Sequence, residues 1–146
     1  MSAQPTAAEL LQHKIVIEGL RLAYKESGVG TDRPIEQGGF ILRQPSMATY
    51  KVVRLPAGTQ ATLVYPLCMD GTFEGQEIVA SFHTHPNTGS EWQQQPSPQD
   101  IQLSQNYPET MGTYQFVISK ERLYYVNNDG NVTDMGATSY ILGIDE

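Results

Sequence analysis

The stretch that decides the fold is Glu77-Ile78-Val79-Ala80-Ser81-Phe82-His83-Thr84-His85, which predicts the clearest strand of the chain. Because side chains alternate along a strand, two sets are expected on opposite faces. They are Ile78, Ala80 and Phe82 on one face, and Ser81, His83 and His85 on the other. One face can then belong to the core, while the other carries a site.

Ahead of this stretch, residues Ala7 to Ser27 predict one helix with a broad apolar stripe. Thr6 is expected to cap it, and Glu9, three positions on, completes a capping box. A stripe of this width predicts packing against a sheet. It is centred on Leu11, Ile15 and Leu22, with Leu10, Ile17, Leu20 and Tyr24 adjoining.

Further strands are predicted on both sides, and a second helix is expected to begin at Ser97, with Pro98 in its first turn, and to end before Pro108. The residues from Asn87 to Pro96 predict a polar loop. This order of elements favours an α+β fold with a curved, mixed and mainly antiparallel sheet flanked by helices. The predicted strands are Gly38–Arg43, Tyr50–Leu55, Gln60–Leu67 (after a turn at Pro56–Thr59), Thr113–Ser119, Arg122–Val126 and, after a turn at Asn127–Gly130, one between Asn131 and Leu142.

The bulk properties predict a single domain over residues 1–146. The net charge of −7 and the lack of a Lys/Arg cluster argue against binding to nucleic acid or to an anionic membrane; a basic partner stays open. A single cysteine, Cys68, allows no intrachain disulfide. With neither a signal sequence nor an apolar run of membrane-spanning length, we expect a cytoplasmic location, and non-classical export stays open.

Two imidazoles and a carboxylate provide a candidate three-ligand set for zinc. His83 and His85 are two apart on a strand, so both rings project to the same side. Asp100 lies in the first turn of a helix that follows a loop, and that loop can bring its carboxylate to the same point. A catalytic zinc site uses three protein ligands and leaves the fourth position to water.

Two further residues have side chains suited to hydrolysis. Glu36 can act as the general base that takes a proton from the water and passes it to a leaving amine. It precedes Gly38-Gly39, where the backbone can pass close to a substrate. Ser97 can donate a hydrogen bond to the oxyanion that forms on a carbonyl.

Each piece also has a purely structural interpretation. The His-x-His pair alone is equally compatible with two ordinary strand histidines, and Ser97-Pro98-Gln99-Asp100 alone is a good helix start. Glu36 alone is typical of a solvated loop acid. Trp92 is either a substrate contact or a cover for its loop, and Cys68 is interpreted as a small hydrophobic residue rather than a nucleophile.

Taken in order, Glu36, His83-Thr84-His85-Pro86 and Ser97-Pro98-Gln99-Asp100 resemble the signature of the JAMM metalloproteases, also called JAB or MPN-plus domains. Pro34-Ile35-Glu36-Gln37-Gly38-Gly39-Phe40 resembles the family's Pro-x-Glu-x-x-Gly-Phe segment. The resemblance spans roughly Ala7 to Tyr125. It implies a cytidine-deaminase-like JAB/MPN fold, with Zn²⁺ bound by His83, His85 and Asp100, Glu36 as general base and Ser97 stabilising the tetrahedral intermediate.

The resemblance also implies an activity. Family members hydrolyse peptide or isopeptide bonds, often after the C-terminal Gly-Gly of ubiquitin, a ubiquitin-like protein or a sulfur carrier, so a protein or peptide substrate is expected. Two alternatives stay open: a toxin or cell-wall peptidase delivered between bacteria, and a non-catalytic MPN-like scaffold. One departure is the loop between the second His and the Ser, which has eleven residues (Pro86–Pro96) where the family has about seven; this leaves the substrate open.

Overall fold

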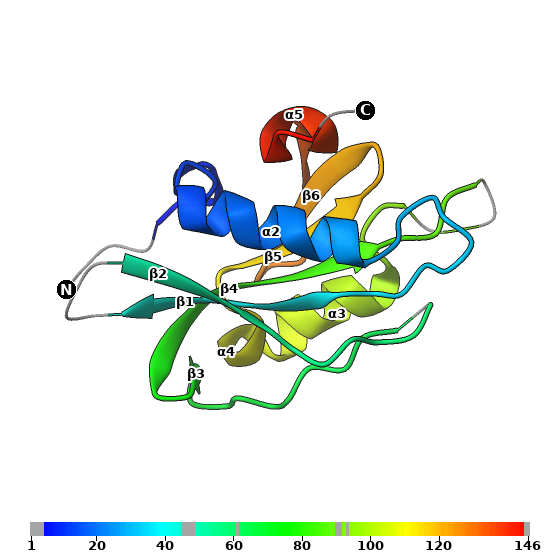
Figure 1. Ribbon diagram of the computed structural model, residues 1–146. Helices are drawn as coiled ribbons and strands as arrows, with labels where there is room; N and C mark the ends of the chain where they lie inside the picture. Colours follow the sequence, from blue (N-terminus) through cyan, green and yellow to red (C-terminus); the bar gives the residue numbers. More distant parts are fainter. Residues whose placement is uncertain (1–4, 45–48, 61, 90–91, 93, 145–146) are drawn as a thin grey trace.

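The described strands form one open, mixed sheet with helices on both faces (Figure 1). The computed structural model describes residues 5–44, 49–60, 62–89, 92 and 94–144. The order is β2-β1-β4-β5-β6-β7, with β3 paired to β4 off this path, and every described pair except parallel β4 and β5 is antiparallel. The expected mixed, mainly antiparallel sheet is therefore confirmed. The strands are β1 (Gly38–Gln44), β2 (Thr49–Arg54), β3 (Thr72–Phe73), β4 (Gln76–His85), β5 (Tyr114–Ser119), β6 (Arg122–Asn127) and β7 (Val132–Ala137).

The parallel pair explains where the helices α3 (Pro98–Asn106) and α4 (Pro108–Met111) lie. Parallel neighbours cannot be joined by a tight turn, so the chain crosses from the end of β4 to the start of β5 over one face of the sheet. Figure 1 shows α3 and α4 on that face and α2 and α5 (Thr138–Leu142) on the other. The end of α3 before Pro108 is confirmed. The short helices α4 and α5 are unexpected, because four or five residues are too few to show a helical period.

The predicted single helix from Ala7 to Ser27 is wrong: there are two helices, α1 (Ala7–Leu10) and α2 (Lys14–Glu26). The capping box of Thr6 and Glu9 is confirmed, but it caps only the four-residue α1. Within α2, Ile15 and Leu22 lie on a different face from Val16, Leu20 and Ala23. The predicted stripe is therefore wrong in its centre: Ile15 and Leu22 are about half exposed. The buried face of α2 consists of Val16, Leu20 and Ala23.

A β-bulge in β4 overturns the predicted alternation of its side chains. Ile41 of β1 pairs with Ala80, but the next residue, Leu42, pairs with Ile78, so Val79 is the extra residue. Ile78 consequently packs with the cluster on the α3 side of the sheet rather than with Ala80. Beyond the bulge the alternation holds as expected: Phe82 packs on the α2 side, and His83 lies opposite to it.

The strand predicted at Gln60–Leu67 is wrong, because the described residues of this segment pair with no strand of the sheet. The preceding residues run beside the start of β1 instead: Gly58 N donates to Glu36 O and Glu36 N to Thr59 O, both at 2.8 Å. After Thr59 the chain turns and runs under the sheet on the α3 side (Figure 1). This path brings Tyr65 beneath β4, where its hydroxyl reaches a strand carbonyl.

The glycines at the start of β1 allow close packing within the sheet. A Cβ on Gly39 would overlap the carbonyl of Val53 in β2, and one on Gly38 would overlap the carbonyl of Phe82 in β4. The absence of a side chain therefore lets β1 lie between its two neighbours. The same pairing places Gly38 opposite His83. Glu36, two residues before Gly38, therefore lies near the end of β4.

Candidate metal centre

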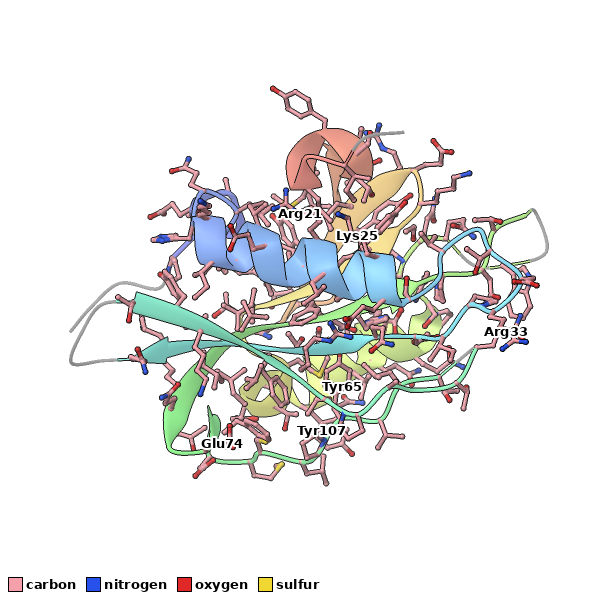
Figure 2. All side chains as sticks on the ribbon, viewed as in Figure 1. Arg21, Lys25, Arg33, Tyr65, Glu74 and Tyr107 are labelled. Carbon is pink, nitrogen blue, oxygen red and sulfur yellow. The ribbon has the colours of Figure 1, made fainter. Side chains whose placement is uncertain are left out.

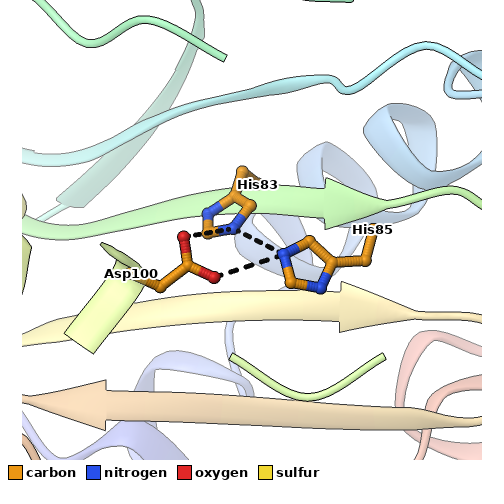
Figure 3. A group of neighbouring side chains, drawn as sticks. All are labelled: His83, His85 and Asp100. Carbon is orange, nitrogen blue, oxygen red and sulfur yellow. Dashed lines mark hydrogen bonds and ion pairs between the residues drawn. The ribbon is translucent and has the colours of Figure 1, made fainter. Parts of the chain in front are cut away.

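His83, His85 and Asp100 converge on one point on the α3 side of the sheet (Figure 3). His83 Nε2 lies 3.2 Å from His85 Nε2 and 3.3 Å from Asp100 Oδ1, and His85 Nε2 lies 3.2 Å from Asp100 Oδ2. The two imidazoles come from the C-terminal end of β4, and the carboxylate comes from the first turn of α3. This group can hold a metal ion.

The spacing of these atoms fits a small cation. Three ligand atoms point their lone pairs at one another, which is unfavourable unless protons or a cation lie between them. Atoms that bind a tetrahedral ion at ~2.0–2.1 Å lie ~3.3–3.4 Å apart. The two Nε2 atoms are separated by 3.2 Å, and each of them has a different oxygen of Asp100 at a similar distance. Two imidazoles with one carboxylate suit zinc and other first-row transition metals rather than calcium or magnesium, which prefer oxygen ligands.

The start of α3 positions the carboxylate of Asp100. Ser97 Oγ accepts a hydrogen bond from Asp100 N at 3.1 Å, and Asp100 Oδ2 accepts one from Ser97 N at 2.8 Å, which forms a capping box. Gln115 of β5 donates to Asp100 O at 2.8 Å and to Ser104 Oγ at 2.7 Å, so it ties this turn to the sheet. Burial acts to raise the pKa of Asp100, but the adjacent imidazoles outweigh it and hold that pKa well below its ordinary value.

Glu36 is held against the same cluster by its neighbour Gln37. Gln37 N donates to Thr84 Oγ1 at 3.0 Å, and Thr84 N donates to Gln37 O at 2.9 Å, so this segment lies beside the strand between the two histidines. Glu36 is only 7% exposed. Burial raises the pKa of its carboxyl to about 7; His85 opposes this increase, and the charge of Asp100 adds to it.

Tyr65 lies directly behind His83. Its hydroxyl donates to the carbonyl of Phe82 at 2.6 Å and is 3.4 Å from His83 Nδ1, the ring nitrogen that faces away from the cluster. Burial raises the pKa of Tyr65 well above its ordinary value, with a further contribution from the charges of Asp100 and Glu36. The phenol is therefore neutral at neutral pH and retains its proton.

The cluster borders a pocket of about 370 Å³, which Glu36, Tyr65 and Ser97 also line. Asn87, which lines this pocket, is held by Gln60: Gln60 Nε2 donates to Asn87 Oδ1 at 2.8 Å, and Asn87 Nδ2 donates to Gln60 O at 2.6 Å. Gln94 Nε2 donates to Asn87 O at 2.7 Å, which ties the following loop to Asn87. Trp92, from this loop, also lines the pocket and is 36% exposed, so the pocket combines an aromatic side chain with two carboxylates and two imidazoles.

The structure brings together all five residues that the sequence singled out, Glu36, His83, His85, Ser97 and Asp100, in this pocket. Sequence reasoning missed Tyr65 and the Gln60–Asn87 link. Tyr65 and Gln60 come from the segment that was predicted as a strand and Asn87 from the predicted loop, and no local pattern marks these three residues. Of the loop from Asn87 to Pro96, residues 90, 91 and 93 lie outside the described residues.

No protein-family model, curated protein or solved structure matches this chain. Among the described residues, no helix has both the length and the apolar character needed to cross a membrane. Fold and site together define a mixed α/β protein with a mostly antiparallel open sheet and a cluster of two histidines and an aspartate that can hold a metal ion.

Proposed function

We propose that this protein is a zinc-dependent metallopeptidase of the JAMM (JAB/MPN-plus) type, with a cytidine-deaminase-like JAB/MPN fold, that hydrolyses a peptide or isopeptide bond. One observation carries the proposal: a single pocket contains a three-ligand cluster, a buried acid and a hydroxyl at a helix start. The buried acid is Glu36, whose pKa of about 7 matches what a general base needs at neutral pH.

The ligand set by itself also suits iron, because two histidines and one carboxylate are the ligands of non-haem iron oxygenases. Glu36 favours hydrolysis over oxygen chemistry, since a buried carboxylate in the same pocket as the ligands has a defined use in proton transfer. When bound, a zinc ion supplies a Lewis acid for the substrate carbonyl and lowers the pKa of water to ~7. Metal analysis of the purified protein separates the two metals.

In this mechanism Glu36 takes the proton of the attacking water and delivers it to the leaving amine. Ser97 stabilises the oxyanion: its Oγ already accepts from Asp100 N, and no acceptor among the described residues takes its hydroxyl hydrogen. That hydrogen is available to a substrate oxygen in the pocket. His83, His85 and Asp100 would hold the metal ion beside both groups.

The substrates supported best are proteins or peptides with an extended tail, including the Gly-Gly end of a ubiquitin-like or sulfur-carrier protein. A cell-wall stem peptide is the substrate of the alternative toxin or cell-wall peptidase. Trp92 lines the pocket and is 36% exposed, so we expect it to contact a tail that enters the pocket. Trp92 is the only tryptophan of the chain, so its fluorescence reports directly on occupancy of this pocket.

The test is incubation of zinc-loaded protein with Gly-Gly-tailed proteins and with muropeptides, with Glu36→Gln as the blank. We expect cleavage of one substrate class and a roughly 100- to 10,000-fold loss of rate in the variant, at unchanged zinc content. Protein that is purified without stoichiometric metal and takes up none would end the proposal. The non-catalytic scaffold would be favoured by two results together: zinc binds but no substrate is cleaved, and the Glu36→Gln variant has the same biological effect as the unmodified protein.

A further inference from the structure

We infer that Tyr65 is a positioning residue of the metal centre: its hydroxyl holds the His83 ring with the proton on Nδ1, which leaves Nε2 free to bind the ion. The inference rests on the proposed function only in requiring a bound metal, and it does not depend on the substrate. It assigns a role to a residue outside the set of five that carries the resemblance to a known family.

The hydrogen-bond roles of the two groups follow from their contacts. A tyrosine hydroxyl has one hydrogen, and Tyr65 donates it to the carbonyl of Phe82 at 2.6 Å. Toward His83 Nδ1, 3.4 Å away, the same oxygen can then only accept. A neutral imidazole carries one N–H, so a donor at Nδ1 makes Nε2 the nitrogen with the lone pair. Nε2 is the atom that faces His85 and Asp100.

The hydroxyl is well placed because the Tyr65 ring is itself fixed. The ring packs against Phe40 with centroids 5.7 Å apart and meets the His83 ring edge-on at 6.4 Å. Figure 2 shows Tyr65 on the opposite side of the sheet from Arg21 and Lys25 of α2. Since Phe82 and His83 are consecutive, one hydroxyl contacts both the strand backbone and the imidazole that this backbone carries. It therefore sets the orientation of the ring relative to its own strand.

The second histidine lacks such a contact. His85 Nδ1 is buried, and no hydrogen-bond partner for it is found among the described residues. The orientation of the cluster therefore depends on His83 more than on His85. Residues that hydrogen-bond the outer nitrogen of a metal-binding histidine typically contribute 10- to 100-fold to metal affinity.

The experiment measures zinc affinity by competition with a chromophoric chelator for the full chain, for Tyr65→Phe and for Tyr125→Phe. Tyr125 is a partly buried tyrosine on the α2 side of the sheet. The control variant therefore also loses one tyrosine hydroxyl, but at a position away from the metal-binding cluster. We expect zinc affinity to fall by about 10- to 100-fold in Tyr65→Phe and to stay within about twofold in Tyr125→Phe. Thermal unfolding of the zinc-free proteins establishes that both variants are folded.

A second readout follows the His83 ring itself. In zinc-loaded protein, we expect the Nδ1 proton of His83 to exchange slowly with water, as seen by proton–nitrogen NMR, and to exchange faster in Tyr65→Phe. The chain has three histidines, which simplifies assignment. If the unmodified protein binds zinc and Tyr65→Phe binds it equally well, this inference is wrong and the proposed function stands. If the unmodified protein binds no zinc, both are wrong.

Discussion

At the scale of single residues, Glu36 shows how its surroundings give an ordinary side chain an unusual property. The residue is a glutamate at the start of a strand, where a solvated acid is the simplest expectation. Its pKa is nevertheless raised from 4.5 to about 7, chiefly because the carboxyl is buried. A group in this range can both take and release a proton near neutral pH, which general acid–base catalysis requires.

The raised pKa predicts how stability depends on pH. Between pH 4.5 and about 7 the native state binds a proton that the unfolded state has released, so the contribution of Glu36 to the free energy of unfolding falls as pH rises. Gln does not titrate. In chelator-treated protein we therefore expect Glu36→Gln to gain about 1–3 kcal/mol relative to the unmodified chain between pH 5 and pH 8. Urea denaturation at the two pH values measures the gain; a constant difference would contradict the burial of this carboxyl.

At the scale of elements, the start of α3 combines a structural and a chemical role. The capping box of Ser97 and Asp100 has the same geometry as that of Thr6 and Glu9 at α1. Only the box at α3 lies in the pocket. Its acid, Asp100, has one oxygen bonded to the helix backbone and both oxygens near the imidazoles, so the cap that begins the helix also orients the metal ligand.

This pair of caps offers a matched comparison. Replacing either cap residue by alanine removes one hydrogen bond to a helix N-terminus, so we expect Ser97→Ala and Thr6→Ala each to lose about 1 kcal/mol of stability. Only Ser97→Ala also removes a hydroxyl that faces the pocket, and its peptidase rate is expected to fall by roughly 100- to 1000-fold. Chemical denaturation and rate measurements on both variants separate the two roles. Equal rates in the two variants would leave Ser97 as a helix cap alone.

At the scale of the whole molecule, the candidate metal centre connects elements that come from different parts of the chain. Its ligands belong to β4 and α3, and the segments that carry Glu36 and Tyr65 lie beside or beneath β4. An ion that binds only this arrangement stabilises the native state as a whole, because the ligands do not converge in the unfolded chain.

We therefore expect zinc to raise the midpoint of thermal unfolding. At free zinc a hundredfold above the dissociation constant, the gain is about 2.7 kcal/mol, or ~5–10 °C for a chain of this size. His85→Ala should abolish the shift. His13→Ala should retain it, because His13 lies at the start of α2 against Tyr50 and outside the cluster. A shift that survives in His85→Ala would place the zinc elsewhere on the molecule.

Local rules were enough to predict most elements and part of the site. The alternation near the end of β4 placed His83 and His85 on the same face, and the Ser97-to-Asp100 pattern marked a helix start. These features depend on residues at most a few positions apart, where periodicity and capping act directly. The same rules failed for the first helix, because apolar residues occur on more than one of its faces. Ile15 and Leu22 are half exposed, whereas Val16, Leu20 and Ala23 are buried.

By itself, the sequence determined the strand that carries the two imidazoles, the cap that carries the carboxylate, and the mixed, mainly antiparallel character of the sheet. Only the tertiary structure decided that Glu36 is buried with a raised pKa, that Tyr65 lies behind His83, and that Val79 forms a bulge. The physical reason is the range of the interactions. Helix caps and strand alternation arise within a few residues. The burial and pKa of Glu36 and the contacts of Tyr65 arise between segments that come together only in the folded protein.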